Sequence, residues 1–247
     1  MKTSLFAVSL ATLLKSSFSA DKMDCGDGVN LCGVLTLASG YGPNEYAASA
    51  PYVHGLWPEI DSYGTSECIA PQSTTDPTKL ATCYNNGTNN DADQLDFEQH
   101  EWEKHGCCAG AEDADDYFDQ VCSISTAPLK VMSDSKSSGG DLDAIEKAVT
   151  SAGYEVFYKD TQYSQLYLSA CAGPDAKWKT SPVADFVKNC GGWDPSNNDD
   201  NDATACVTSQ HGPACSSDKD CSDITDCVRC ASSGYCTDVP LSYTETN

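Results

Sequence analysis

The segment F-E-Q-H-E-W-E-K-H-G-C-C (residues 97–108) and the shorter segment H-G-L-W-P (residues 54–58) together hold three of the four histidines of this 247-residue chain. These histidines are His54, His100 and His105. An imidazole has an unperturbed pKa of about 6.5, so it takes up and releases protons near neutral or mildly acidic pH. With Glu101 and Lys104 between the second pair, the two segments predict a site for acid–base chemistry.

A metal site is the first alternative for the histidine pair on the longer segment. Zinc proteases carry the pattern H-E-x-x-H, in which the two imidazoles lie four residues apart on one face of a helix. Here His100 and His105 are five residues apart. At about 100° per residue, five steps separate the two rings by about 140° around a regular helix. The spacing therefore argues against a shared metal ion, and we expect neither a metal nor another cofactor.

The first twenty residues have the pattern of a secretory signal peptide. Lys2 provides the positive start, Leu5 to Leu14 an apolar run, and Ser17 to Ala20 a segment of small residues. The run is shorter than the roughly 20 residues that a membrane span requires. We therefore expect residues 1–20 to be removed, and the remaining chain to be a soluble protein that is secreted or delivered to a vacuolar or lysosomal lumen.

The cysteines agree with an oxidising compartment. All fifteen follow the predicted signal peptide, and such a density is typical of exported, disulfide-bonded proteins. An odd number predicts one thiol that is free or that pairs with another molecule. Asn86-Gly87-Thr88 matches the acceptor triplet for N-glycosylation, which predicts a glycan at Asn86.

The formal net charge of −23 and the pI of about 4.1 limit the possible partners. A protein that holds nucleic acid by a broad basic surface is disfavoured. A short nucleic acid bound at a locally positive cleft remains compatible with this charge. Because protonation of carboxylates weakens repulsion, an acidic environment suits such a protein best.

Residues 25 to about 192 contain the segments with regular structural patterns. Runs rich in β-branched, leucine and aromatic residues predict strands, at 31–38, 51–57, 154–158 and 165–170. Helical composition and helix-ending signals predict helices, at 97–105, 112–123 and 141–150. Residues 61–94 and 133–140 are polar and predict loops, the first with one short helix at most. The mixture predicts an α+β fold, in which helices pack on an antiparallel sheet.

The sequence changes character at Trp193. Residues 194–202 (D-P-S-N-N-D-D-N-D) are acidic and lack apolar spacing, which is typical of a linker. Six cysteines follow, with too few apolar residues for an independent core. They are Cys206, Cys215, Cys221, Cys227, Cys230 and Cys236. We therefore expect a main domain at 21–192, an acidic linker at 193–204 and a small disulfide-rich module at 205–247, whose partner is not indicated.

The two histidine segments closely resemble the two signature segments of the ribonuclease T2 family, the secreted acid endoribonucleases. The resemblance extends over most of residues 25–192, is strong in the two segments and is weak elsewhere. It implies the α+β fold of that family and cleavage of RNA without a metal, through a 2′,3′-cyclic phosphate to 3′-phosphate ends. RNA is then the substrate, and nothing in the sequence points away from a monomer.

The resemblance also assigns roles, which match what the chemistry requires. The 2′-hydroxyl of RNA must lose a proton and the leaving 5′-oxygen must gain one. By resemblance His105 is the base and His54 the acid, while Glu101 and Lys104 flank the phosphorane, where a cation offsets developing negative charge. His100 resembles a phosphate-binding histidine. Residues expected to contact bases are Trp57, Phe97 and Glu59, of which Trp57 and Phe97 are also plausible core residues.

Three departures from the family pattern bear on these expectations. Glu59 stands where an aspartate is usual, which leaves base preference open. Cys107 stands where a threonine is usual, which predicts either an extra disulfide or a free thiol beside the catalytic helix. The early strand lacks the usual glutamine and aromatic residues. By resemblance Cys68–Cys108 and Cys171–Cys190 form bridges, and the partners of the other cysteines stay open.

Two rival functions were compared with the enzyme. The first is an extracellular binding or defence protein that keeps the scaffold without activity and acts through its cysteine-rich tail. The second is a metallohydrolase, which the histidine spacing already disfavours. Every catalytic position of the resembled family is present, so the sequence favours the ribonuclease.

Overall fold

The computed structural model describes residues 22–85, 87, 90–193, 217–222, 229–230 and 236–237. The predicted signal peptide, the glycosylation site at Asn86 and nearly all of the predicted linker lie outside these residues, as does most of the cysteine-rich module. Within the described residues, no helix is long and apolar enough to cross a membrane.

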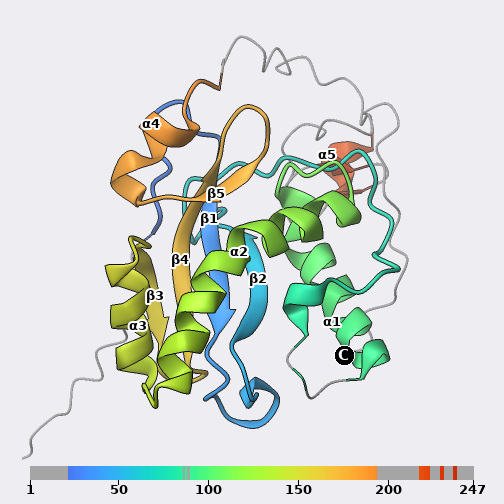
Figure 1. The fold of residues 1–247 in the computed structure, drawn as a ribbon. Helices are drawn as coiled ribbons and strands as arrows, with labels where there is room; N and C mark the ends of the chain where they lie inside the picture. The colour runs from blue at the N-terminus through green and yellow to red at the C-terminus, as the bar shows by residue number, and fades with distance from the viewer. Residues whose placement is uncertain are drawn as a thin grey trace, which may run out of the picture.

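Strands and helices alternate in blocks along the chain (Figure 1). The described strands are β1 (Leu31–Ala38), β2 (Tyr52–Pro58), β3 (Val156–Asp160), β4 (Gln165–Ala172), β5 (Trp178–Thr180), β6 (Arg229–Cys230) and β7 (Cys236–Thr237). The described α-helices are α1 (Asp91–Lys104), α2 (Ala114–Ser137), α3 (Leu142–Ser151), α4 (Phe186–Cys190) and α5 (Asp218–Cys221). Short 3-10 helices occur at η1 (Asn44–Tyr46), η2 (Thr82–Tyr84), η3 (Gly106–Cys108) and η4 (Val183–Asp185).

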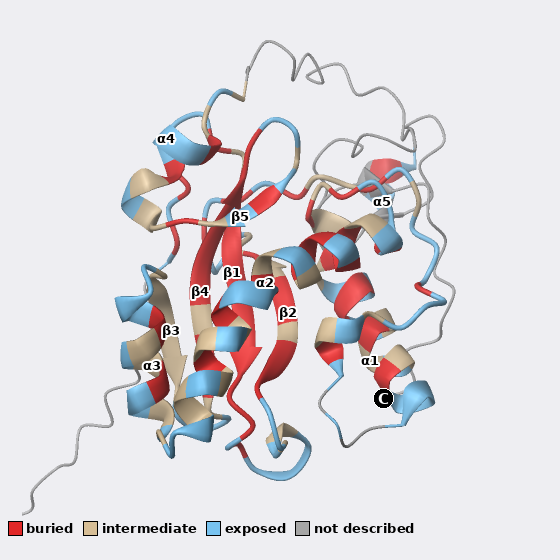
Figure 2. Ribbon diagram, in the orientation of Figure 1, coloured by how far each residue is buried: buried red, intermediate tan, exposed pale blue. Residues whose placement is uncertain are grey.

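The main sheet is antiparallel, with the strand order β2-β1-β4-β3, and β5 pairs with the end of β4. Helices α2 and α3 lie across one face, and α1 lies beyond the edge strand β2 (Figure 1). The central strands are buried, whereas the helices expose their outer sides (Figure 2). The predicted α+β fold with an antiparallel sheet is therefore confirmed.

The core explains why these segments became strands and helices. All eight residues of β1 are buried, and Leu31, Leu35 and Leu37 point into the same apolar cluster as Leu166 and Leu168 of β4. This cluster also receives side chains from the helices, notably the fully buried Trp102 of α1. Tyr117, Phe118 and Val121, predicted to lie on the inner side of a helix, are buried in it as expected.

Two helices differ from the sequence prediction. Helix α1 begins at Asp91, six residues before the predicted start, because the side chain of Asn90 accepts hydrogen bonds from two backbone amides and caps the helix. Helix α2 runs on to Ser137, so the loop predicted from residue 133 is wrong in its first half. Its buried face continues past Val121 through Ser125, Pro128 and Met132, and this packing overrides the helix-breaking tendency of proline.

The strands match more closely. Residues 31–38 form a strand as predicted, and β2 is shifted by one residue. Strand β3 starts at Val156 and ends at Asp160, two residues later than expected. Strand β4 extends to Ala172, because its last residues pair with β5 as well as β1.

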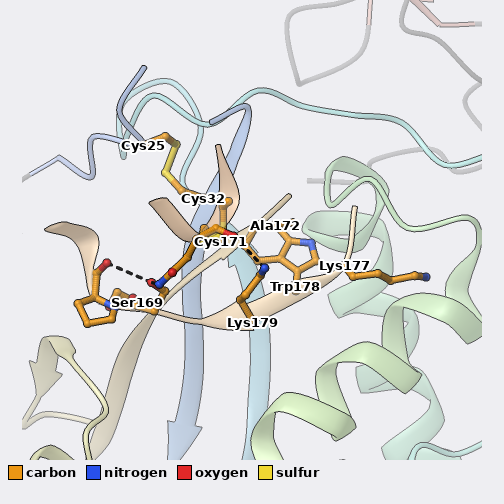
Figure 3. The surroundings of a disulfide bond; sticks show 12 residues. Cys25, Cys32, Ser169, Cys171, Ala172, Lys177, Trp178 and Lys179 are labelled. Carbon is orange, nitrogen blue, oxygen red and sulfur yellow. Dashed lines mark hydrogen bonds between the residues drawn. A yellow bond between two sulfur atoms is a disulfide. The ribbon is translucent and has the colours of Figure 1, made fainter. Parts of the chain in front are cut away.

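Four disulfides join the described parts of the main domain. They are Cys25–Cys32, Cys68–Cys108, Cys83–Cys122 and Cys171–Cys190. The second and fourth are the pairs expected from the family resemblance. Cys32 and Cys171 face each other across β1 and β4, so the first and fourth bridges lie close together at one end of the sheet (Figure 3).

Candidate active site

His54 lies at an irregular point of the edge strand. Leu37 of β1 pairs with Val53 and Thr36 pairs with Gly55, so His54 is the extra residue of a β-bulge. A bulge bends the strand and redirects a side chain, and bulges are common beside active sites. The bulge therefore sets the direction of the His54 imidazole, which is 14% exposed.

The two ring nitrogens of His54 have different neighbours. Nδ1 lies 2.8 Å from the amide oxygen Oε1 of Gln165, the first residue of β4. Nε2 lies 3.7 Å from Oε1 of Glu101. Burial lowers the pKa of His54, and the hydrogen bond that the ring makes to Gln165 Oε1 opposes this shift.

Glu101 is the most buried ionisable group at the site, with its side chain 2% exposed. Burial raises its pKa to about 8, although a 2.8 Å hydrogen bond from the indole Nε1 of Trp57 to Oε2 favours the charged form. Burial acts on His54 in the same sense, towards its neutral form. At a pH between the lowered pKa of His54 and the Glu101 pKa of about 8, the two groups therefore face each other as neutral partners rather than as an ion pair.

Trp57 connects the two histidine segments. Its ring stacks on His105 with the centroids 5.0 Å apart and the planes at 26°, and meets the edge of His54 at 5.0 Å. On β4, Tyr167 contacts the same indole, with a centroid separation of 5.6 Å. The indole therefore contacts Glu101 and both imidazoles. Together with Tyr167, these side chains surround its ring.

His105 follows the last residue of α1, and its backbone N–H donates to the carbonyl of Glu101. Burial lowers the pKa of His105 to about 4, and positive charge on His100, His54 and Lys104 adds to this effect. The imidazole is therefore held neutral over most of the acidic range. Neutral imidazole is the form that can accept a proton.

The other two predicted site residues of this segment, His100 and Lys104, lie on the exposed side of α1. His100 and Lys104 are exposed, and neither makes a hydrogen bond or ion pair with a residue that the structure describes. Both still act on His105 electrostatically. Lys104 is thus an exposed cation near His105, with the exposed carboxyl group of Glu103 next to it in the chain.

The residues predicted to contact bases are distributed around this centre. Phe97 is half-buried, and its ring lies 5.4 Å from that of His54. Glu59 follows the end of β2, and burial raises its pKa to about 7. The structure thus brings Phe97 next to His54 and places Glu59 two residues beyond Trp57.

Cys107 is a free thiol. Of the two alternatives that the sequence left open, an extra disulfide and a free thiol, the structure has the second. It lies in η3 directly after the His105-Gly106 step and packs against the main core. Burial raises its pKa to about 12, so it stays a protonated thiol.

Three neighbours of the site were not predicted from the sequence. Gln165 contacts His54 from 111 residues further along the chain. Tyr46 lies 5.7 Å from the His54 ring. Gly55 leaves the space for Glu101 and Trp57, since a Cβ at this position would collide with Glu101 Oε2 and Trp57 Nε1. Only the glycine lies inside a recognisable motif, H-G-L-W-P. A glycine between two large side chains there is a signal that another group approaches the backbone closely.

No group of three histidine, cysteine, aspartate or glutamate side chains is arranged to hold a metal ion in the part of the chain that the structure describes. The site instead combines two imidazoles, a buried carboxyl group and a nearby ammonium group.

Comparisons with known proteins agree with the motifs. The model of the Ribonuclease T2 family matches residues 29–152. A curated relative, "Ribonuclease 3" of Arabidopsis thaliana, is 33% identical over 81 residues, which are 27% of this chain and 34% of that protein. The chain therefore matches only about a third of the length of this relative.

Two solved structures match this chain at low identity over most of their own length. One is Actibind, described as a T2 ribonuclease, with a TM-score of 0.43 and 19% identity over 67% of this chain and 91% of that one. The other is the S3-RNase of Japanese pear, with a TM-score of 0.38 and 15% identity over 62% of this chain and 90% of that one.

Proposed function

The chain belongs to the ribonuclease T2 family, and from this premise we propose that it is an endoribonuclease acting on single-stranded RNA. The reaction is a transphosphorylation through a 2′,3′-cyclic phosphate, which is then hydrolysed to a 3′-phosphate. The observation that carries the proposal is the pair His54 and His105 held around one indole, with Glu101 hydrogen-bonded to the same ring.

His105 acts as the base in the first step. The 2′-oxygen attacks phosphorus while its proton passes to the imidazole, and the bond from phosphorus to the 5′-oxygen then breaks. A base must begin without a proton, and the low pKa of His105, about 4, provides this above that pH.

His54 acts as the acid for the leaving group. The leaving 5′-oxygen takes a proton from this imidazole, which must therefore enter the reaction as the cation. Because burial lowers the pKa of His54 below its ordinary value of 6.5, the required form is populated only at acidic pH. In the hydrolysis step the roles reverse: His54 takes a proton from water and His105 returns one to the 2′-oxygen.

Glu101 and Lys104 stabilise the negative charge that develops on the phosphorane. With a pKa of about 8, Glu101 is protonated at acidic pH and donates a hydrogen bond to a phosphoryl oxygen instead of repelling it. Lys104 and His100 contribute positive charge from the exposed side of α1, His100 as a phosphate-binding group.

Base recognition is assigned to the surface around His54. Phe97 offers an aromatic ring next to the acid, and Glu59 offers a carboxyl group that is partly neutral at neutral pH. Trp57 serves mainly to position Glu101 and His105, since one face of its ring is stacked on His105.

The cellular setting is proposed from the sequence. Residues 1–20 act as a signal peptide, Asn86 carries a glycan, and the mature enzyme works as a monomer outside the cell or in an acidic vacuolar or lysosomal lumen. The cysteine-rich module at 205–247 follows the acidic linker as an appendage, and the catalytic domain spans 21–192. Four disulfides among the described residues support an oxidising compartment.

The proposal is tested by the variants His54→Phe and His105→Phe, assayed on a homopolymeric RNA at pH 5. We expect each to lower kcat by on the order of a thousandfold or more, because each removes one proton-transfer group. Circular dichroism and thermal unfolding verify that the fold is kept. The matched control is Tyr63→Phe, which alters an exposed ring elsewhere on the surface and should leave kcat unchanged. A folded His105→Phe variant with near-normal turnover would sink the assignment.

A further inference from the structure

We propose that Gln165 is a positioning residue that fixes the tautomer of His54, so that the proton exchanged during the reaction always resides on Nε2. The expected effects on turnover rest on the proposed function. The expected tautomer rests on the structure alone. Its starting point is the 2.8 Å contact between Gln165 Oε1 and His54 Nδ1.

The chemistry of the two atoms gives the direction of this hydrogen bond. An amide oxygen can only accept, so Nδ1 must carry the hydrogen. This holds for the neutral ring and for the cation, because both keep a hydrogen on Nδ1. The proton that His54 gains and loses is then the one on Nε2, which points towards Glu101 at 3.7 Å.

The location of Gln165 holds its side chain in one position. It is 1% exposed and lies at the start of the central strand β4, where it pairs with Ala38 of β1 and Asp160 of β3. A buried amide that lost its partner would be left unsatisfied at a free-energy cost, so the hydrogen bond resists exchange with water. His54, in contrast, lies at a bulge of the edge strand and has no pairing residue opposite it.

The bulge and the hydrogen bond have complementary effects. The bulge sets the direction of the His54 ring, and the hydrogen bond then determines which nitrogen carries the hydrogen, because Gln165 Oε1 accepts from Nδ1 while Nε2 faces Glu101. An imidazole in the wrong tautomer presents a hydrogen where the reaction needs a lone pair, or the reverse. Gln165 therefore acts on the reaction through His54 and has no need to touch RNA.

The same hydrogen bond favours the cationic ring, because a cation donates more strongly than a neutral imidazole. Several other groups act on this ring, and burial has the largest effect. The charged or titratable groups around His54 are Glu101, His100 and His105 at α1, Tyr46 at η1 and Asp160 at the end of β3. A variant at position 165 leaves all of these in place, so a change in titration can be attributed to the lost acceptor.

The test compares Gln165→Met, which keeps the length of the side chain and removes the acceptor, with Gln165→Glu, which keeps an oxygen at the same place. The matched control is Gln120→Met, because Gln120 is also buried and its Oε1 accepts a hydrogen bond, but from the backbone of Trp178. A long-range ¹H–¹⁵N spectrum of the folded, full-length protein reports tautomer and pKa for each histidine, and a His54→Phe variant assigns the His54 signals.

In the wild type we expect the neutral His54 ring to carry its hydrogen on Nδ1. In Gln165→Met we expect a mixture of tautomers, a lower pKa for His54, and a loss in kcat at pH 5 of on the order of tenfold to a hundredfold with little change in KM. The alkaline limb of the pH–rate profile should move to lower pH in Gln165→Met and return in Gln165→Glu. Gln120→Met should lose stability without moving this limb.

Two results would overturn the inference: a wild-type hydrogen on Nε2 in the neutral ring, or a tautomer and a pKa that do not change in Gln165→Met. Both are read from the spectra and need no turnover. If the tautomer behaves as expected but RNA is not cleaved, the proposed function fails and the positioning role of Gln165 stands.

Discussion

Burial controls the acid–base pair at the scale of single residues. His54 and His105 are both half-buried against Trp57, and in both cases burial is the main cause of a lowered pKa. The two shifts have opposite consequences for the proposed reaction. A low pKa keeps His105 neutral, as the proposed base must be. The same shift means that His54, the proposed acid, carries its proton only in acidic solution.

This pair of shifts predicts the pH dependence. For kcat/KM on a dinucleotide we expect a bell-shaped curve, with an acid limb near the His105 pKa of about 4 and an alkaline limb below 6.5, where His54 loses its proton. Because Lys104 contributes to the low pKa of His105, Lys104→Ala should move the acid limb to higher pH. An optimum above pH 7 would contradict the assigned roles.

Glu101 predicts an effect on stability. Its pKa is about 8 in the folded chain against an ordinary value of 4.5. Between these values the folded chain holds a proton that the unfolded chain has released, so this group lowers the free energy of unfolding as the pH rises. Glu101→Gln has no such proton, and the wild type should lose on the order of a few kcal/mol more than this variant between pH 4.5 and 7.5.

Urea unfolding at the two pH values measures this difference. The control is Glu103→Gln, since Glu103 lies exposed on the same helix and should keep the wild-type dependence. Equal pH dependence in Glu101→Gln and the wild type would show that the carboxyl group is ionised in the folded protein.

The sequence was sufficient for the residues of the two motifs but not for their neighbours. The grouping of His54 with the His100–His105 segment followed from residue type and resemblance, and the structure brings the rings of His54 and His105 against one indole. Gln165 could not be found in this way. A lone glutamine at the start of a strand has no pattern that marks a role, and its contact with His54 depends on the register between distant strands.

At the scale of structural elements, the close contact between α1 and β2 brings the residues of the site together. Glu101 reaches across the edge strand to Trp57 directly over Gly55, and Tyr117 of α2 donates a 2.7 Å hydrogen bond to the carbonyl of Leu56. Two helices are thus held on a strand that has no further strand on its outer side.

Gly55→Ala tests this contact. The added Cβ would collide with Glu101 Oε2 and Trp57 Nε1, so we expect a loss of about 1–3 kcal/mol in stability and a lower kcat as Glu101 is displaced. The control is Gly173→Ala, whose Cβ would meet only the side-chain oxygen of Asp175 at 3.2 Å. Urea unfolding and a cleavage assay report both effects, and a Gly55→Ala enzyme with normal kcat would mean that Glu101 does not need this position.

The elements themselves were predictable to different degrees. Strand β1 is apolar except for Thr36 and is buried on both faces, so its bounds were visible in the sequence. The first three residues of α1 are exposed, and the capping by Asn90 marks the start of the helix. Helix α2 continues through Pro128 because its buried face continues, and tertiary packing of this kind is not encoded in a local pattern.

Charge dominates at the scale of the whole molecule. A net charge of −23 repels RNA, and Lys104 is a single exposed cation beside the site. Since repulsion of this kind is screened by salt, we expect kcat/KM for a long RNA at pH 7 to rise as salt increases from low to physiological concentration. A dinucleotide, which carries a single phosphodiester, should respond much less.

Steady-state rates at several salt concentrations check this expectation. A steep fall in kcat/KM for the long RNA would point instead to an extended basic contact surface, as counterion release requires. Such a surface is not expected from the composition, because acidic residues outnumber basic ones by 37 to 14.

The central claim is that two imidazoles perform the cleavage without a metal, and the most direct measurement is the identity of the product ends. Purified full-length protein is incubated with total RNA at pH 5 in the presence of a chelator, with His105→Phe as the control. We expect 2′,3′-cyclic phosphates that convert to 3′-phosphates, formed by the wild type and not by the variant. Products with 5′-phosphate ends, or cleavage abolished by the chelator, would contradict the account.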